Sequence, residues 1–132
     1  MPAEKLVIGA AFYGRTFKGV DGEGDGLAME AGGDNHAGPD YDVLTPAYLA
    51  EHGFKRYWDE SAKAPWLFNG STFISYDDPE SLAEKAKYSM EKGLGGVMYW
   101  VYDTAYHSGL NHILRLELDQ AAAEDESNAA NV

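Results

Sequence analysis

Two nearly continuous apolar segments, far apart in the chain, most constrain what this sequence can fold into. They are Lys5 to Tyr13 (KLVIGAAFY) and Gly95 to Tyr102 (GGVMYWVY). A strand in a parallel sheet is covered on both faces, so it lacks the polar–apolar alternation of a half-exposed strand. The two segments therefore predict two buried strands of a parallel sheet. Because side chains alternate along a strand, Ala11 shares one face with Tyr13 and Arg15.

The elements around the second apolar segment are helical. Asp78 to Lys92 begins with a capping residue followed by Pro79 and stops before Gly93, which predicts a helix. A last helix, capped by Ser108, carries an apolar face as far as Leu118. Helix, buried strand and helix in succession are typical of parallel α/β architecture.

Between the two buried strands the sequence predicts a small antiparallel insertion. Asn69-Gly70 separates the apolar runs Trp66–Phe68 and Thr72–Ile74, which is a strong signal for a β-hairpin. Phe54–Asp59 alternates and predicts a further strand. Thr45–Glu51 predicts a short helix, since it has a capping threonine, a proline in the first turn and a glycine beyond its end.

The chain is strongly acidic, and the charge is unevenly distributed. Its 132 residues include 10 Lys and Arg against 22 Asp and Glu, a formal net charge of −12. Such a surface repels phosphate, which argues against nucleic acid and against an anionic membrane as partners. The glycine-rich stretch from Gly19 to Phe54 has neither Lys nor Arg and, outside the short helix, predicts a loop. Residues 119–132 contain no large apolar residue before Val132, which predicts a disordered acidic tail.

Several kinds of chemistry lack the residues that they need. There is no cysteine, which excludes disulfides and thiolate sites and leaves the redox compartment open. No apolar run approaches the roughly 18 residues of a membrane helix, and no secretory signal segment opens the sequence. Asp21–Gly26 resembles the opening of a calcium loop, but Gly32 stands where the bidentate Glu is required, so a solvated loop is favoured.

Motifs for cofactors and catalysis are also missing from the sequence. It has no Gly-x-Ser-x-Gly elbow, phosphate-binding glycine loop or His-Glu-x-x-His. Nothing in their spacing selects a catalytic pair among the 22 carboxylates. We therefore expect no metal and no cofactor. None of the four histidines has the spacing of metal ligands: His36, His52, His107 and His112.

Aromatic residues mark the candidate binding site. Three Trp and nine Tyr are many for this length, and the flat faces of aromatic rings suit the C–H faces of sugars. Tyr13-Gly14-Arg15 lies just past the carboxyl end of the first buried strand, and Trp100 lies near that of the second. Binding groups gather at this end in barrel and open α/β folds. By pattern alone, binding and core packing are equally open as roles for these residues.

Four motifs in order resemble the C-terminal part of a glycoside hydrolase family 18 chitinase. The resemblance extends from residue 2 to about residue 118. The motifs are Pro2–Arg15 (PAEKLVIGAAFYGR), Arg56–Asp59 (RYWD) with Ala64-Pro65, Phe73–Ser81 (FISYDDPES) with Lys85, and Gly93–Trp100 (GLGGVMYW).

The resemblance implies a fold class: α/β with an α+β insertion. The family fold is a (β/α)8 TIM barrel, of which residues 1–16 and 77–118 would form the C-terminal portion with strands seven and eight. Residues 17–76 would be the small antiparallel insertion domain that forms one wall of the substrate cleft. Residues 119–132 would be the disordered tail.

The resemblance also implies an activity and a site. The family cleaves the β-1,4 links of chitin with retention: a Glu protonates the leaving oxygen, and the N-acetyl carbonyl of the substrate acts as nucleophile. Trp100 would be the floor beneath the sugar, Tyr13 and Arg15 would line the non-reducing side, and Met98 would be a further substrate-binding residue. The implied partner is chitin or an N-acetylglucosamine oligosaccharide, and the implied location is extracellular. For Tyr57–Asp59 a structural role is favoured over a cleft-lining one.

The chain departs from the family at the catalytic centre. The family motif Asp-x-x-Asp-x-Asp-x-Glu occurs nowhere in it, and Val101 follows Trp100 where the family often carries Glu. We therefore expect no catalytic residue here and a C-terminal fragment that is inactive alone. The alternatives are a non-catalytic chitooligosaccharide-binding domain and an interaction domain without sugar affinity.

A fragment of a barrel leaves strand edges and apolar faces uncovered, because two strands cannot close a barrel. Strands 6–13 and 95–101 are therefore expected to pair with each other or, through self-association, with a second copy. The insertion is expected to supply a core of its own. The barrel-strand side chains expected to lack partners are Leu6, Ile8, Val97 and Met98.

Overall fold

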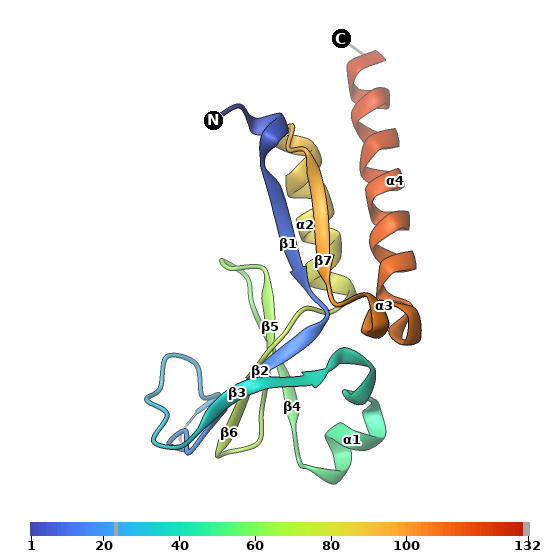
Figure 1. The fold of residues 1–132 in the computed structure, drawn as a ribbon. Helices are drawn as coiled ribbons and strands as arrows, with labels where there is room; N and C mark the ends of the chain where they lie inside the picture. Colours follow the sequence, from blue (N-terminus) through green and yellow to red (C-terminus); the bar gives the residue numbers. More distant parts are fainter. Residues whose placement is uncertain (23, 131–132) are drawn as a thin grey trace.

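The computed structural model describes residues 1–22 and 24–130, except for the side chains of residues 124–130. The described strands form two sheets (Figure 1). In the smaller sheet, β1 (Val7–Ala11) and β7 (Gly96–Trp100) run parallel, in a register that places Ala11 opposite Trp100. The two apolar segments therefore pair with each other, one of the two alternatives that the sequence left open.

The larger sheet is antiparallel and has five strands in the order β3-β2-β6-β5-β4. Its strands are β2 (Tyr13–Lys18), β3 (Asn35–Asp40), β4 (Lys55–Asp59), β5 (Ala64–Phe68) and β6 (Thr72–Ser75).

The predicted hairpin is confirmed and joins β5 to β6. Asn69 Oδ1 accepts hydrogen bonds from the backbone N–H groups of Ser71 (3.2 Å) and Thr72 (2.9 Å). Gly70 has a φ of +96°, a conformation that residues with a Cβ rarely adopt. The turn chemistry visible in the sequence thus fixes this connection.

Two predictions about strands are wrong. The stretch after Gly19 contains a strand, β3, where a loop was expected; its sequence NHAGPD has no apolar pattern, and β2 is its pairing partner at the sheet edge. The segment from Lys5 to Tyr13 is not one strand either. β1 ends at Ala11, and β2 begins at Tyr13 in the other sheet. The chain crosses between the sheets at Phe12.

The described helices comprise α1 (Pro46–Glu51), α2 (Pro79–Glu91), α3 (Tyr102–Ser108) and α4 (Leu110–Ala130), with short 3-10 turns at Ala3–Lys5 (η1) and Tyr41–Val43 (η2). Two of the three predicted caps are confirmed. Thr45 accepts from the Tyr48 N–H (3.3 Å), and Asp78 and Ser81 bond to each other's backbone in a capping box. The third residue, Ser108, is the last residue of α3 rather than the N-cap of α4, and its Oγ accepts from the Leu110 N–H (3.3 Å). No local signal in the sequence predicted α3. None of these helices has the length and apolar character needed to cross a bilayer.

The backbone of α4 continues well past the predicted end of the last helix. The sequence predicts disorder from residue 119, whereas the helix runs to Ala130. Ala121–Ala123 are strong helix formers, and a helix that is already nucleated is extended at little cost. The part of that prediction that concerns residues 131–132 lies outside the described residues.

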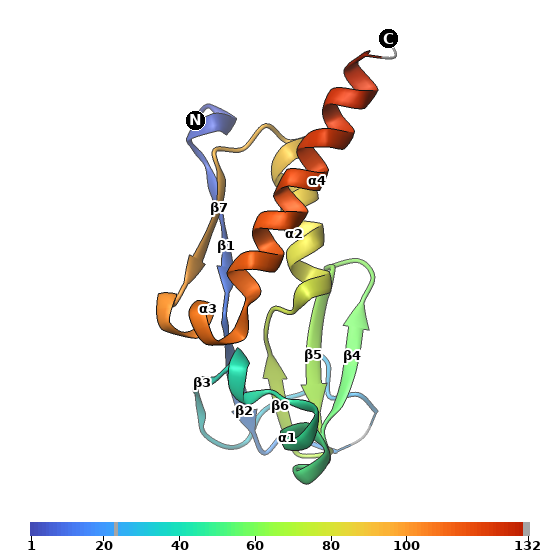
Figure 2. The same cartoon turned by 90° about the vertical axis from the view of Figure 1, so that its right-hand side faces the viewer.

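Hydrophobic side chains gather in three clusters, so each sheet has a core. The first cluster lies between the small sheet and the two long helices, α2 and α4, which lie side by side (Figure 2). Its buried residues are Ala10, Phe12, Leu82, Ala86, Ala105, Leu110 and Leu114. The other two clusters lie on opposite faces of the five-stranded sheet, since neighbouring β5 residues belong to different clusters. They are Val20, Trp66 and Phe68, and Leu44, Leu67 and Ile74.

The face of the small sheet away from the helices is open. Val7 is 54% exposed and Met98 is 48% exposed. Leu6 is exposed as well, as expected. Val97 was expected to lack a packing partner, but it packs against the first cluster, so that expectation is wrong.

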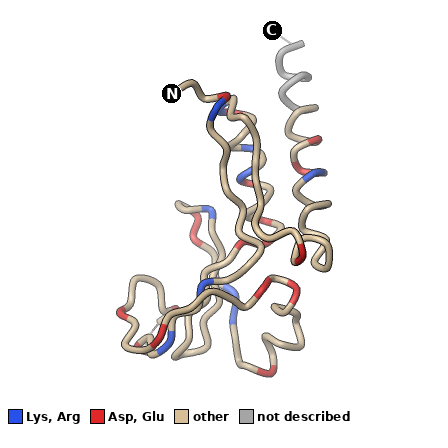
Figure 3. The backbone as a smooth tube through the Cα atoms, in the orientation of Figure 1, with Lys and Arg blue, Asp and Glu red and all other residues tan. Residues whose placement is uncertain are grey.

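Charged residues are spread over both parts of the molecule (Figure 3), and a few of them fix the junction between the sheets. Asp77, which is buried, accepts hydrogen bonds at Oδ2 from the Ala11 N–H (2.8 Å) and from Lys85 Nζ, and at Oδ1 from Ser81 Oγ (2.9 Å). Lys85 Nζ also donates to the Gly9 carbonyl at 2.9 Å. One carboxylate therefore holds the end of β1 against the start of α2.

A second set of ion pairs holds the larger sheet to the same helix. The Arg56 guanidinium, on β4, contacts Asp78 at 2.8 Å and Glu80 at 2.7 Å, and both acids lie at the start of α2. The N-terminal end of α2 is thus bonded to both sheets.

Replacing Asp77 by Ala should cost about 2–3 kcal/mol of unfolding free energy, because the Ala11 N–H and Lys85 Nζ lose their shared acceptor. Asp119→Ala is the matched control: its carboxylate is 58% exposed and pairs with Arg115 within α4, so the loss should stay below about 0.5 kcal/mol. Urea unfolding followed by circular dichroism measures both. Equal losses in the two variants would show that Asp77 does not hold the junction.

Replacing Gly14 by Ala should lower the unfolding free energy by about 1–3 kcal/mol, the usual cost of overpacking. A Cβ there would lie 2.7 Å from Ile74 Cγ2 and 3.3 Å from the Pro39 carbonyl oxygen, and Ile74 is buried and cannot move aside easily. In the control Gly32→Ala, the new Cβ meets only the Gly19 oxygen at 3.5 Å, so the change should stay within about 0.5 kcal/mol. Thermal unfolding compares the two variants. If Gly14→Ala leaves the unfolding free energy unchanged, β2 is packed less tightly against Ile74 than the structure indicates.

Candidate functional site

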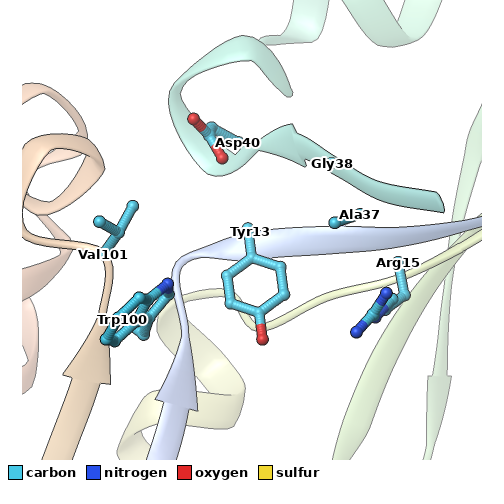
Figure 4. Close-up of a pocket in the computed structure, with 7 residues that line it drawn as sticks. All are labelled: Tyr13, Arg15, Ala37, Gly38, Asp40, Trp100 and Val101. Atoms are coloured by element: carbon cyan, nitrogen blue, oxygen red, sulfur yellow. The ribbon is translucent and has the colours of Figure 1, made fainter.

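A cavity of about 340 Å³ lies where the two sheets meet (Figure 4). Trp100 enters it from the end of β7, and Tyr13 and Arg15 enter it from the start of β2. We call this cavity the junction hollow. Its lining is completed by Ala37, Gly38, Asp40 and Val101.

The crossing between the sheets brings these side chains together. The Phe12 N–H donates to the Trp100 carbonyl (2.9 Å), which fixes the end of β1 beside the end of β7. The Phe12 ring is fully buried and stacks on Tyr99, with 4.9 Å between centroids. Because successive side chains alternate, Tyr13 and Trp100 point away from that core, toward the hollow.

The wall opposite Trp100 comes from β2 and β3. Tyr13 and Arg15 lie on the same face of β2, and β3 pairs with it so that Tyr13 stands opposite Asp40 and Arg15 opposite Ala37. The Phe12 carbonyl accepts from the Tyr41 N–H at 3.1 Å, which holds the end of β3 over the junction.

Met98 lines an adjoining cavity of about 400 Å³, together with Tyr13, Trp100 and residues of β1. Tyr13 and Trp100 therefore belong to both cavities. All four residues proposed from the sequence (Trp100, Tyr13, Arg15 and Met98) lie in this one region. Trp100 is 64% exposed, so one side of its indole is open to solvent.

Sequence reasoning missed Asp40. It belongs to the acidic stretch that was interpreted as a solvated loop, and no local pattern distinguishes it from the acids around it. Only its register opposite Tyr13 places it in the hollow. By contrast, the residues Tyr57–Asp59 make structural contacts. Tyr57 stacks on Trp66, Trp58 lies beneath the Arg56 guanidinium, and Asp59 accepts from two backbone N–H groups of the following turn.

Two tyrosines near Asp78 and Arg56 have rings 6.3 Å apart between their centroids: Tyr41 and Tyr76. Burial raises the pKa of Tyr76 well above the usual value, and the Asp78 carboxylate raises it further against the opposing effect of Arg56. Burial and Asp78 also raise the pKa of Tyr41. Both phenols stay protonated at neutral pH, so neither supplies a general base.

The hollow offers binding groups: an exposed indole, a phenol, a guanidinium and a carboxylate. An indole gives an apolar platform, and the other three donate or accept hydrogen bonds. Such a set fits a polar ring that has an apolar face, as a sugar has. Within the described residues, no three His, Cys, Asp or Glu side chains gather in a metal-binding arrangement; Glu23, in the acidic run Asp21–Gly26, lies outside them.

Comparisons with known proteins point in one direction. The family model for glycosyl hydrolases family 18 matches residues 1–105. Chitinase A1 of Niallia circulans is 38% identical over 126 residues, which cover 89% of this chain and 18% of that protein.

Two solved structures resemble the fold. The family 18 N-acetylglucosaminidase from Paenibacillus barengoltzii is 44% identical with a TM-score of 0.75, over 92% of this chain and 34% of that one. A mutant of the class V chitinase from Nicotiana tobaccum, in complex with NAG4, is 26% identical with a TM-score of 0.78, over 89% of this chain and 35% of that one. The chain thus spans between about a fifth and about a third of the length of these relatives.

The family match covers most of the chain, and the relatives share both its sequence and its fold, so this protein belongs to glycosyl hydrolases family 18.

Proposed function

We propose that this chain is the C-terminal part of a chitinase-like hydrolase of family 18. In this proposal β1 and β7 are strands seven and eight of the (β/α)8 barrel, α2 is the helix between them, and α4 is the last helix. The parallel pairing of β1 with β7 and the packing of α2 and α4 against them support it. The five-stranded sheet would be the α+β insertion domain; since β2 starts at Tyr13, the insertion would begin a few residues before residue 17.

The ligand of the junction hollow would be an N-acetylglucosamine oligosaccharide, which is a short stretch of chitin. The observation that carries this proposal is the meeting of Trp100, Tyr13 and Arg15 in one cavity, although they come from different sheets. Trp100 would be the floor under a sugar ring, and Tyr13 and Arg15 would bond its hydroxyl or amide groups. Met98 would contact the apolar edge of the same ring. The relative solved with NAG4 supports this ligand class.

Catalysis would belong to the complete protein. Its acid would come from the motif Asp-x-x-Asp-x-Asp-x-Glu, which this chain lacks, and the N-acetyl carbonyl of the substrate would act as nucleophile. The part present here would orient the sugar. An extracellular location follows from the same proposal, because chitin is an extracellular polymer.

A non-catalytic chitooligosaccharide-binding domain is the second candidate. The 64% exposed Trp100 platform in a chain without the acidic motif favours it. Both candidates predict sugar binding, and they differ in whether an upstream segment supplies the acid. Self-association through the open face of β1 and β7 belongs to the first candidate, since a barrel fragment leaves that face without cover.

The chain alone should not hydrolyse chitin oligosaccharides. The acidic motif that carries the family's proton donor is absent from the sequence, so release of reducing ends should stay at the level of buffer. The measurement is chromatography of an N-acetylglucosamine hexasaccharide incubated with the chain. Turnover that follows the protein through purification would contradict the claim of inactivity.

Replacing Trp100 by Ala should weaken binding of an N-acetylglucosamine disaccharide about fivefold or more, because an aromatic platform contributes about 1 kcal/mol. Trp58→Ala is the matched control, since Trp58 lies under Arg56 on β4 and does not line the hollow. Nuclear magnetic resonance titration suits the millimolar affinity expected of a cleft with one wall. If Trp100→Ala and Trp58→Ala bind equally well, the indole of Trp100 is not the platform.

A further inference from the structure

Helix α3 buries its small residues and exposes its large ones. Its buried residues are Thr104 (3% exposed) and Ala105 (0%), whereas Tyr102 and Tyr106 are 72% and 74% exposed. A surface helix normally turns its large apolar side chains toward the core. An aromatic pair in solvent is therefore the informative feature of this helix.

The helix that carries the two tyrosines begins at the junction hollow. α3 follows β7 directly (Figure 1), and Val101, which lines the hollow, is its N-cap residue. The Ala105 N–H donates to the Val101 carbonyl at 3.2 Å, and the Ala105 side chain is anchored in the first hydrophobic cluster. The position of α3 relative to the hollow is thus fixed by a hydrogen bond and by packing.

Spacing along the helix places both rings on one face. Residues four apart lie one turn apart, with Cβ atoms about 6 Å from each other. The aromatic contact of Tyr106 is an edge arrangement with its neighbour His107, at 5.4 Å and 83°, and it leaves the ring largely exposed. The pair therefore forms a small aromatic surface on the helix that directly follows the strand of Trp100.

The chemistry of this surface favours a neutral, hydroxylated ligand. Each tyrosine presents a flat apolar face and a hydroxyl, which together match the face and the rim of a sugar ring. The chain has a net charge of −12, so an anionic polymer would be repelled. On the same helix, Asp103 Oδ1 lies 3.8 Å from His107 Nε2. When His107 is protonated, it partly offsets the negative charge of Asp103.

We propose that Tyr102 and Tyr106 form a second aromatic platform, which binds further sugar units of an N-acetylglucosamine chain held at Trp100. The inference rests on the proposed function of the hollow and extends it: the ligand would be a long chain rather than a short oligosaccharide. The tyrosines act in binding only, and they touch no reacting atom.

The test compares two ligand lengths on the full chain. A disaccharide occupies the Trp100 hollow alone, whereas a hexasaccharide also reaches α3. The double variant Y102A/Y106A should weaken hexasaccharide binding about twofold to tenfold for each ring removed, the size of an aromatic contact, and leave disaccharide binding unchanged. Y102F/Y106F, which keeps both rings, should retain most of the hexasaccharide affinity.

A control on another helix separates this effect from the general loss of an exposed tyrosine. Tyr88 on α2 is 50% exposed and does not line the hollow, so Tyr88→Ala should leave binding of both ligands unchanged. The substituted side chains are on the surface, so circular dichroism should show an unaltered fold in each variant.

Three outcomes would overturn this proposal and leave the proposed function intact. The first is unchanged hexasaccharide binding in Y102A/Y106A, and the second is an equal loss for both ligand lengths, which would indicate a distorted hollow. The third is a change of oligomeric state in sedimentation with sugar affinity unaltered, which would assign the tyrosines to a second copy of the chain. Trp100→Ala tests the hollow separately: without an effect on the disaccharide, the proposed function fails by itself. Absence of any sugar binding by the unmodified chain would overturn both.

Discussion

The site depends on one residue, Phe12, at which the chain leaves one sheet and enters the other. Its N–H donates to the Trp100 carbonyl (2.9 Å), and its carbonyl accepts from the Tyr41 N–H (3.1 Å). Its ring is fully buried and stacks on Tyr99. Three strand ends, those of β1, β7 and β3, are therefore fixed at one point. Because the next side chain points the opposite way, burial of Phe12 is what turns Tyr13 into the hollow.

Two adjacent carboxylates secure this arrangement from the side of the helix. Asp77 bonds to β1 and to Lys85, whereas Asp78 caps α2 and pairs with Arg56 of β4. The backbone at Asp78 is extended, and successive side chains in extended backbone point in opposite directions. Neighbouring residues can thus serve two different sheets. Burying charge is costly unless it is fully bonded, and both acids are satisfied by several partners.

The open face of the small sheet and the exposed aromatic residues have a common physical origin. Parallel strands are normally covered on both faces, whereas the helices among the described residues cover one face of β1 and β7. Val7 and Met98 are left half exposed, and the same lack of cover leaves the Trp100 indole accessible. In our proposal the upstream barrel would cover the strands and leave the indole for the sugar. The binding surface and the incomplete fold would then be two consequences of one missing part.

Local chemistry alone determined much of the fold. The Asn69-Gly70 turn, the caps at Thr45 and Asp78 and the two apolar strands could be predicted, because each depends on residues within a few positions of one another. The resemblance of the motifs around Tyr13, Arg15, Met98 and Trp100 indicated the region of the site as well.

Tertiary structure decided the rest. β3 has no apolar pattern and pairs with β2 at the sheet edge, and Asp40 enters the hollow only through its register opposite Tyr13. The break at Phe12 divides an apolar run that looks uniform in the sequence. The exposure of Tyr102 and Tyr106 likewise depends on which face of α3 meets the core. Each of these features is set by contacts between segments tens of residues apart, and no short stretch of sequence encodes such contacts.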